Sequence, residues 1–329
     1  MEEINWGIIG CGDVTEVKSG PAFNKVSNSK LIAVMRRDAE KAKDYAIRHQ
    51  VPKWYANVDE LINDPAINAI YIATPPSSHT EYALKAIAAG KSVYVEKPMA
   101  LSYNDGKQMV DAANASGVKL VIAHYRRQQP FFLKIKSLID ENSIGNIRLA
   151  NLSFLQPSNN DVIAKSAANW RIDPSISGGG LFHDMAPHQL DLMLYFFGEV
   201  ERCIGLSTST TNSLADDLVT GQIQFKNNVI FNGSWCFNVA KADTIDQCDI
   251  YGESGKISFP IFGNQLNLTQ NDKTTTYEAE PLAHVQQPMI AKVVAYFLGK
   301  AENPCSGETA LETMKLLDAF TQSIVYKEL

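Results

Sequence analysis

Short runs of β-branched and other apolar residues alternate with alanine-rich stretches of helical spacing through the first part of this 329-residue chain. Strands that are separated by helices along a sequence form parallel βαβ units, in which the helices cover the sheet. The alternation therefore predicts an α/β doubly wound parallel sheet. The expected strands are Ile4–Gly10, Lys30–Met35, Ala69–Ala73, Ser92–Val95 and Val118–Ala123, and the expected helices are Ala39–His49, Ser78–Ala89 and Tyr103–Ser116.

The pattern changes after about residue 123, where strand follows strand with turn signals between them. Leu218–Phe225 and Val229–Phe237 flank one such turn, which is typical of an antiparallel meander. We therefore expect two domains: residues 1–123 form the doubly wound sheet, and residues 124–329 form an α+β domain with a largely antiparallel open sheet. Helices are expected in the second domain at Pro130–Glu141, Gly180–Phe197, Val285–Leu298 and Glu308–Tyr326.

Composition and charge exclude several classes of function. The net charge is −6 and no long run of lysine and arginine occurs, so a nucleic-acid partner is not expected. No apolar stretch is long enough to span a bilayer and no signal peptide is visible, so we expect a cytoplasmic protein without a membrane partner. The five cysteines include no CxxC pair, which predicts reduced thiols and no metal site.

The first expected strand ends in the sequence GIIGCGDVT, in which Gly10 and Gly12 form a G-x-G. Glycines at a first strand-to-helix junction let the backbone approach a pyrophosphate, whose charge the following amides then meet. We expect Gly10, Gly12, Asp13 and Val14 to bind a dinucleotide in a Rossmann domain, with Thr15 replacing the third small residue of the motif. A tight turn after a strand is the alternative, since a G-x-G alone is a weak signal.

Three later segments carry unusual combinations of residues. They are Ala73-Thr74-Pro75-Pro76 with His79, then Glu96-Lys97-Pro98, then Gly178-Gly179-Gly180 followed by Asp184, His188 and Asp191. Together with the G-x-G and Asn169-Trp170-Arg171, their order and spacing resemble the glucose-fructose oxidoreductase / inositol dehydrogenase family (Gfo/Idh/MocA). The resemblance covers nearly the whole chain and is strongest from Ile4 to Pro130 and from Trp170 to Gly198.

Lys97 stands at the carboxyl end of an expected parallel strand, where such sheets bind ligands. Its ammonium can hydrogen-bond a substrate hydroxyl or a cofactor ribose, although most lysines are simply solvated. In the resembled family this lysine lies beside the nicotinamide and assists proton transfer, and its peptide bond to Pro98 is often cis. Glu96 either joins the cofactor site, or simply orients Lys97 or caps the local backbone. We also expect Thr74, Pro75 and His79 at the cofactor site.

If the stretch after Gly180 is helical, Asp184, His188 and Asp191 share a stripe of roughly one sixth of its circumference. Their neighbours are apolar, so the helix is expected to be buried, and buried charges need partners. The stripe is either a satisfied structural network or a general acid/base histidine tuned by a carboxylate. Pro187 leaves open whether the helix starts before it, because a proline either kinks a helix or marks its first turn.

The resemblance implies that Lys97, Asp184 and His188 form the catalytic set, with Asp184 orienting the imidazole. Lys97 and His188 are then a coupled pair, and the sequence leaves open which of them transfers the proton. Asp191 matches the last acid of the motif and serves either substrate binding or local structure. His183 is either a further substrate contact or a packed histidine.

Four more residues are candidate substrate contacts. Trp170 and Arg171 suit a sugar-like or polyol-like small molecule, which offers an apolar C–H face and many hydroxyls. A buried tryptophan that anchors the loop is the equal alternative. His124 and Tyr125 lie where the resembled family runs towards its active site.

The end of the second expected strand suggests the choice of cofactor. An NAD-specific site places an acid there to accept hydrogen bonds from the ribose diol, but this chain has Arg36 followed by Arg37. Guanidinium groups favour a 2′-phosphate, which predicts a preference for NADP(H) with NAD(H) possible. The alternative is that Asp38 reaches back to the ribose and restores the use of NAD.

The expected reaction is hydride transfer between nicotinamide and a secondary alcohol or carbonyl, in which the protein moves the proton. Two alternatives share the architecture: a glycosidase that uses NAD without net redox change, and a dinucleotide-sensing regulator without catalysis. The resemblance also implies a homodimer or homotetramer formed through the sheet of the second domain.

Overall fold

The computed structural model describes residues 2–158, 170–210, 214–322 and 326–327, and the chain divides into two compact units. The first unit comprises Met1–Tyr125 and Leu282–Leu311, and the second comprises Arg126–Pro281 and Glu312–Leu329. Residues 282–311 thus return to the first unit, whereas the sequence analysis assigned all of residues 124–329 to the second. A linear pattern shows that a helix is amphipathic but does not show which sheet its apolar face covers.

The first unit contains a parallel sheet, as predicted. Its strands are β1 (Ile4–Ile9), β2 (Ser29–Met35), β3 (Lys53–Tyr55), β4 (Ala69–Ile72), β5 (Ser92–Val95) and β6 (Leu120–Ile122). Their order in the sheet is β3-β2-β1-β4-β5-β6, so the direction of winding reverses between β1 and β4. Ligands of doubly wound sheets bind beyond the carboxyl ends of the strands at such a reversal. The short edge strand β3 was not foreseen.

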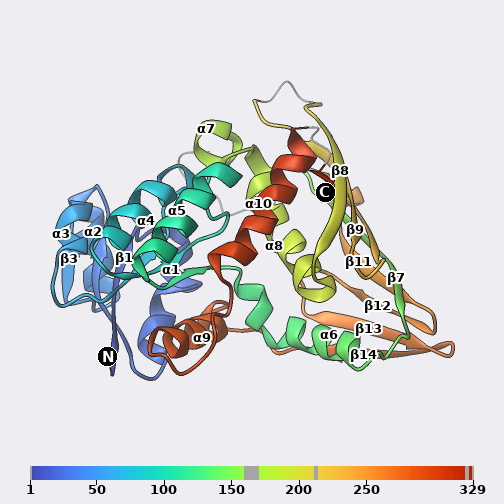
Figure 1. Cartoon of the computed structure of the whole chain (residues 1–329), viewed down its shortest axis with the longest axis horizontal. Helices are drawn as coiled ribbons and strands as arrows, with labels where there is room; N and C mark the ends of the chain where they lie inside the picture. The colour runs from blue at the N-terminus through green and yellow to red at the C-terminus, as the bar shows by residue number, and fades with distance from the viewer. Residues whose placement is uncertain (1, 159–169, 211–213, 323–325, 328–329) are drawn as a thin grey trace. The chain divides into compact units, whose positions relative to one another are not determined.

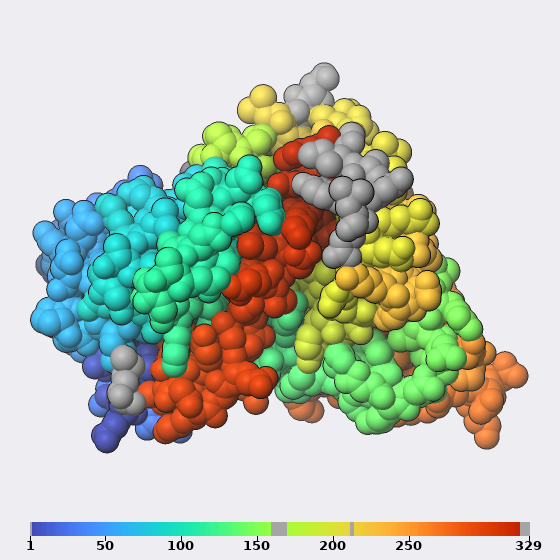
Figure 2. Space-filling model, in the orientation of Figure 1, coloured from blue at the N-terminus to red at the C-terminus, as the bar shows by residue number. Residues whose placement is uncertain are grey.

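Helices cover this sheet and begin and end where local signals favour it. They are α1 (Asp13–Val17), η1 (Gly20–Lys25), α2 (Ala39–Arg48), α3 (Val58–Ile62), η2 (Pro76–Ser78), α4 (His79–Ala88) and α5 (Tyr103–Ser116). Side chains of Asp38, Asn57 and Ser102 cap α2, α3 and α5. Helices α4 and α5 pack side by side, in teal in Figure 1 and Figure 2.

The returning segment completes the first unit with α9 (Gln287–Phe297), which packs against η1 (Figure 1). Its apolar face is buried, and the ring of Phe297 lies 5.6 Å from the ring of Trp6 in β1. Burial of such a face is what holds a helix of this length in place, because isolated helices of a dozen residues are marginal in water. The connection before α9 therefore also lies in the first unit.

The second unit contains a largely antiparallel sheet, as predicted. In the described part of the chain its strands are β7 (Ile147–Leu155), β8 (Val200–Thr208), β9 (Leu218–Phe225), β10 (Ile230–Cys236), β11 (Ile245–Gly252), β12 (Gly255–Phe259), β13 (Gln265–Gln270), β14 (Lys273–Glu278) and β15 (Tyr326–Lys327). The order is β14-β13-β12-β11-β7-β10-β9-β8-β15, and the pair β10–β7 is parallel. Buried side chains alternate with exposed or half-buried ones along β9 and with half-buried ones along β10, so one face is packed and the other is more open.

Helices of the second unit include α6 (Pro130–Asp140), α7 (Pro174–Ser177) and α8 (Gly180–Phe197), with η3 (Tyr125–Gln128), η4 (Trp170–Ile172) and η5 (Lys241–Asp243) as short turns. Helix α10 (Gly307–Thr321) begins in the first unit and ends in the second. Its residue Phe320 covers the sheet so closely that a Cβ at Gly221 would lie 2.1 Å from the ring.

Helix α8 starts at Gly180 and contains Pro187, which answers the question that the sequence left open. Asp184 therefore belongs to the same helix as His188 and Asp191. In the described residues, no helix combines the length and the apolar character needed to cross a membrane.

Candidate active site

Four neighbouring strands of the first unit end at one edge of the parallel sheet, and each carries a predicted site residue just beyond its end. In sheet order β2 leads to Arg36, β1 to Gly10, β4 to Thr74 and β5 to Lys97. The last hydrogen bonds between these strands have N–O distances of 2.8 to 2.9 Å, so the edge is regular. These four positions form a row across the point where the strand order reverses.

The two glycines of the G-x-G serve different purposes. Gly10 has a φ of 91°, and a Cβ there would lie 2.7 Å from Thr74 Cγ2 and 2.8 Å from Thr74 N. Only glycine allows this close approach between the two strand ends. A Cβ at Gly12 would meet no protein atom closer than 4.0 Å, so the backbone is bare on that side. Bare backbone beyond a strand end fits the pyrophosphate of a dinucleotide.

Thr15 takes the place of the third small residue of the motif without opening the loop. Its side chain is buried, and its hydroxyl donates to the carbonyl of Gly12 at 2.7 Å. Its own carbonyl accepts from the hydroxyl of Tyr45 in α2, also at 2.7 Å. Of the other loop residues, Asp13 is exposed and Val14 is half-buried. The hydrogen bond from Tyr45 therefore fixes the glycine loop to α2.

The residues after β2 point in different directions. Arg36 is half-buried, and its Nη1 donates to the carbonyl of Cys11 in the glycine loop at 3.4 Å. Arg37 is exposed. Asp38 caps α2 by accepting from the amide of Lys41 at 3.2 Å, and this bond lowers the pKa of its carboxyl group. The carboxylate of Asp38 is thus occupied by its own helix.

His79 lies beneath the row, fully buried, with a backbone carbonyl at each ring nitrogen. Nδ1 is 3.0 Å from the carbonyl of Pro98, and Nε2 is 2.7 Å from the carbonyl of Thr74. Burial lowers the pKa of His79 to about 4, so the ring is neutral and donates to one of the two carbonyls. This placement favours a positioning role over the direct cofactor contact that we expected, because the ring links the loops after β4 and β5.

Glu96 and Lys97 follow β5 side by side. Lys97 is half-buried, and its peptide bond to Pro98 is cis, which confirms that prediction. Glu96 is only 6% exposed, and its carboxylate accepts from the backbone amide of Lys97 at 3.2 Å. Its other oxygen accepts from the hydroxyl of Tyr71 and from the side-chain amide of Gln286. The bond to the amide of Lys97 favours a role for Glu96 in holding the local backbone, and Gln286 is a partner that the sequence did not suggest.

His124 and Tyr125 come directly after β6, the next strand of the same sheet. Both side chains are buried, at 2% and 6% exposure. Pro75, the remaining predicted cofactor residue, is half-buried between Thr74 and η2. The described residues hold no group of three or more His, Cys, Asp or Glu placed to bind a metal ion.

In the second unit, His188 faces an aromatic and charged group that sequence reasoning missed. The imidazole meets the ring of Phe262 edge-on at 5.8 Å, and the guanidinium of Arg126 lies 4.4 Å from the centre of the same ring. Asp246 accepts from the backbone amide of Phe262 at 2.7 Å, and burial raises the pKa of this carboxyl group. His188 itself is 5% exposed. No local motif marks Phe262 or Asp246: Phe262 lies in the turn between β12 and β13, and Asp246 of β11 holds that turn through its backbone amide.

Asp184 forms an ion pair with Arg171, whose Nε lies 3.0 Å from Oδ2, and the two side chains are 13% and 8% exposed. The guanidinium of Arg171 also lies over the indole of Trp170, 4.4 Å from the ring centre. The structure thus joins two predicted substrate residues to a predicted catalytic one. Asn169, which completes that sequence motif, lies outside the described residues.

The placement of Asp191 and His183 favours their structural alternatives. Arg127 donates to both oxygens of Asp191 at 2.8 Å, and both side chains are buried. His183 is 3% exposed and packs so tightly that a Cβ at Gly179 would lie 2.1 Å from its Nδ1. Burial lowers the pKa of His183 to about 4. Neither side chain is arranged as an open substrate contact.

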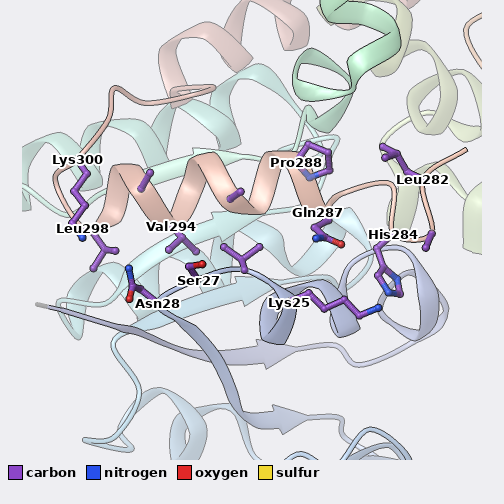
Figure 3. Close-up of a pocket in the computed structure, with 14 residues that line it drawn as sticks. Lys25, Ser27, Asn28, Leu282, His284, Gln287, Pro288, Val294, Leu298 and Lys300 are labelled. Carbon is purple, nitrogen blue, oxygen red and sulfur yellow. The ribbon is translucent and has the colours of Figure 1, made fainter. Parts of the chain in front are cut away.

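A separate surface pocket of about 590 Å³ lies in the first unit between α9 and the residues that follow η1 (Figure 3). Its lining is largely apolar and carries Lys25, His284 and Lys300 at the surface. None of the predicted site residues lines it, so it is distinct from the row at the sheet edge.

A glycine loop with bare backbone, a basic residue beyond the second strand and a lysine beyond the fifth define a class of protein. That class is the nicotinamide-dependent oxidoreductases with a Rossmann domain.

Comparison with known proteins narrows the class to a family. The family model described as oxidoreductase family, NAD-binding Rossmann fold (GFO/IDH/MocA), matches residues 4–124, and the GFO/IDH/MocA C-terminal domain matches residues 132–258. Oxidoreductase P35 of Formosa agariphila is 50% identical over 317 residues, covering 96% of this chain and 98% of that protein. The chain belongs to the Gfo/Idh/MocA family, and it is an NAD(P)-dependent oxidoreductase.

Two further proteins are similar over shorter or more diverged stretches. A scyllo-inositol 2-dehydrogenase (NADP(+)) of Bacillus subtilis is 31% identical over 202 residues, covering 60% of this chain and 53% of that protein. The structure of levoglucosan dehydrogenase with NADH and levoglucosan has a TM-score of 0.87 at 22% identity, covering 98% of this chain and 96% of that chain. The second likeness shows a shared fold.

Proposed function

We propose that this enzyme transfers a hydride between NADP(H) and a secondary alcohol or carbonyl of a sugar, a polyol or a related small molecule. The row from Arg36 through the glycine loop to Lys97 is the observation that carries the proposal. Gly10 and Gly12 would hold the pyrophosphate of a bound dinucleotide, and Arg36 would meet its adenosine end. Bound nicotinamide supplies or accepts the hydride, so the protein's own task is to hold substrate and move a proton.

We assign proton transfer to Lys97 and His188. A lysine or histidine that exchanges a proton with a substrate hydroxyl lowers the barrier most when its position is fixed. The backbone of Lys97 is fixed by Glu96, and the imidazole of His188 packs against Phe262. We assign Asp184 to orient the imidazole of His188, and the ion pair with Arg171 holds its carboxylate in place.

Sugar-like or polyol-like substrates are supported by relatives and by chemistry. The names of two similar proteins specify scyllo-inositol and levoglucosan, both of which carry ring hydroxyls. Trp170 is half-buried, and its indole offers an apolar surface that suits such a ring, while the buried Arg171 holds it in place through the contact with its ring and the pair with Asp184.

The preference for NADP(H) rests on Arg36, which reaches the glycine loop, and on the capping role of Asp38. A carboxylate that caps its own helix is directed towards that helix, whereas a guanidinium near the loop suits a 2′-phosphate. The name of the inositol dehydrogenase specifies NADP(+), whereas the levoglucosan dehydrogenase structure contains NADH, so the preference is argued from the residues of this chain.

A homodimer or homotetramer is a further part of the proposal. The open face of the second unit's sheet carries the exposed apolar side chains Ile204 and Leu206, at 47% and 68% exposure. Large exposed apolar side chains on one sheet face are typical of an interface between copies. Sedimentation velocity of the wild type tests this, and a monomer at all concentrations would contradict it.

The function is tested by following reduced nicotinamide while sugars, inositols, anhydro-sugars and dihydrodiols are each presented with NADP(H) and with NAD(H). We expect net oxidation or reduction of at least one group of compounds. Release of an aryl glycoside without net change of cofactor would favour the glycosidase alternative instead.

A further inference from the structure

Gln286 is a buried polar residue in the segment that returns to the first unit just before α9. It is 1% exposed, and its side chain uses both ends of the amide. Nε2 donates to Glu96 Oε1 at 2.6 Å, and Oε1 accepts from the hydroxyl of Tyr94 at 3.3 Å. Its backbone amide donates to the carbonyl of Lys18 at 3.2 Å. One residue thus contacts β5, the turn after β5 and the end of α1.

Glu96 is held by three donors, which is the arrangement that a carboxylate requires because its oxygens only accept. The donors are the hydroxyl of Tyr71, the amide of Gln286 and the backbone amide of Lys97. Burial raises the pKa of Tyr71 and Tyr94 well above the usual value, so both hydroxyls stay protonated. The carboxylate can therefore turn only if one of these bonds breaks.

The same segment also fastens the helix that follows the glycine loop. His284 Nδ1 lies 2.6 Å from the carbonyl of Val17, and the amide of Gln286 reaches Lys18. From the other side, the hydroxyl of Tyr71 contacts Ser19 Oγ at 3.2 Å. The end of α1 and the turn that bears Lys97 are thus connected through one short stretch of the chain.

We propose that Gln286 is a positioning residue of the active site. It holds Glu96 and, through Glu96, keeps the backbone of Lys97 in a fixed position relative to the glycine loop. What Lys97 does once it is positioned rests on the function proposed above. A displacement of about 1 Å at a reacting group can cost roughly a hundredfold in rate, so such a support has a measurable effect.

The first test reads the position of Lys97 without any turnover. In Gln286→Leu the amide donor to Glu96 is lost, and we expect Lys97 to be acetylated faster by dilute acetic anhydride, as measured by mass spectrometry of its peptide. The increase should lie between about tenfold and about a hundredfold, the range that one lost hydrogen bond to a charged group represents.

Gln287→Leu is the matched control. Gln287 is the next residue, so the same glutamine-to-leucine substitution can be made there. Its side chain lines the surface pocket of Figure 3 instead of contacting Glu96. We expect its variant to leave the acetylation of Lys97 at the wild-type rate. Equal rates in the two variants, or faster acetylation of lysines throughout Gln286→Leu, would overturn the positioning role.

Gln286→Glu is a nearly isosteric second variant that places a carboxyl group against Glu96. Two carboxyl groups at this distance share a proton at low pH and repel each other when both ionise. We expect kcat relative to wild type to fall by about tenfold between about pH 6 and about pH 9, with little change in KM. A ratio independent of pH would overturn the proposal. A wild type without any hydride transfer would contradict the proposed function instead, and the acetylation rates would still decide the role of Gln286.

Discussion

Single residues carry the proposed chemistry, and Lys97 and His188 are the first to test. In Lys97→Ala or His188→Ala we expect kcat to fall by about two to four orders of magnitude, because a proton-transfer partner is lost. Cofactor binding, measured by fluorescence titration, should largely survive His188→Ala. The exposed Lys107, which pairs with Asp111 on α5, offers Lys107→Ala as a control with wild-type turnover. Near wild-type kcat in both active-site variants would show that these residues are structural.

Arg36 decides the cofactor in this account. In Arg36→Asp the charge-assisted bonds to a 2′-phosphate are replaced by repulsion, so kcat/KM with NADP(H) should fall and the preference should move towards NAD(H). Both cofactors are measured with each protein, because a general loss of activity would lower kcat/KM for both cofactors alike and leave their ratio unchanged. The proposal fails where the wild type prefers NAD(H), or where the substitution leaves the preference unchanged.

Residue types and spacing were sufficient to find the row at the sheet edge, because strand ends of a parallel sheet meet at one edge. They were not sufficient to separate residues that face a ligand from those that support them. His79 and Asp191 belong to recognisable motifs, yet both are buried among fixed partners. Gln286 lies far along the chain from Glu96, and no local pattern connects them.

At the level of elements, α8 depends on the buried pair that joins it to η3. Removing the guanidinium in Arg127→Met leaves the carboxylate of Asp191 buried with a lost partner. We expect the free energy of unfolding, from urea denaturation, to fall by about 3–5 kcal/mol. Arg148→Met, which breaks the exposed pair between Arg148 and Glu253, should cost far less. Equal losses of unfolding free energy in the two variants would mean that the buried pair of Arg127 and Asp191 stabilises the protein no more than an exposed pair does.

Most elements of the first unit could be predicted because apolar strand runs alternate with stretches of helical period, and α2 and α5 each begin at a capping side chain. The edge strand β3 was missed, since its three residues are mostly exposed and carry no alternating pattern. Helix α9 was expected near its observed place in the sequence, but its docking on η1 depends on tertiary packing. The sequence did not decide whether α8 starts at Gly180 or at Pro187, because a proline is tolerated within a helix only where the surrounding structure compensates for it.

For the whole molecule, two buried histidines predict sensitivity to acid. Burial lowers the pKa of His79 and of His183 to about 4, from the usual value of about 6.5. Their neutral forms contribute stability that is fully present above about pH 6.5 and is lost as the pH falls towards 4. We expect the urea midpoint to decrease between about pH 7 and about pH 5.

The double variant His79→Gln, His183→Gln provides the comparison, since neither glutamine titrates. Its urea midpoint should depend less on pH over the same range than that of the wild type. Identical pH dependence in the two proteins would place the acid sensitivity in other groups.

The central claim is net hydride transfer to a substrate carbon, and isotope transfer tests it most directly. Reduced cofactor carrying deuterium at the transferable position of the nicotinamide is mixed with enzyme and the carbonyl form of the substrate found by screening. We predict that each reduced product molecule carries one deuterium at the former carbonyl carbon and that an equal amount of cofactor is oxidised. Product without deuterium, or cleavage of a glycosidic bond with the cofactor unchanged, would contradict the claim.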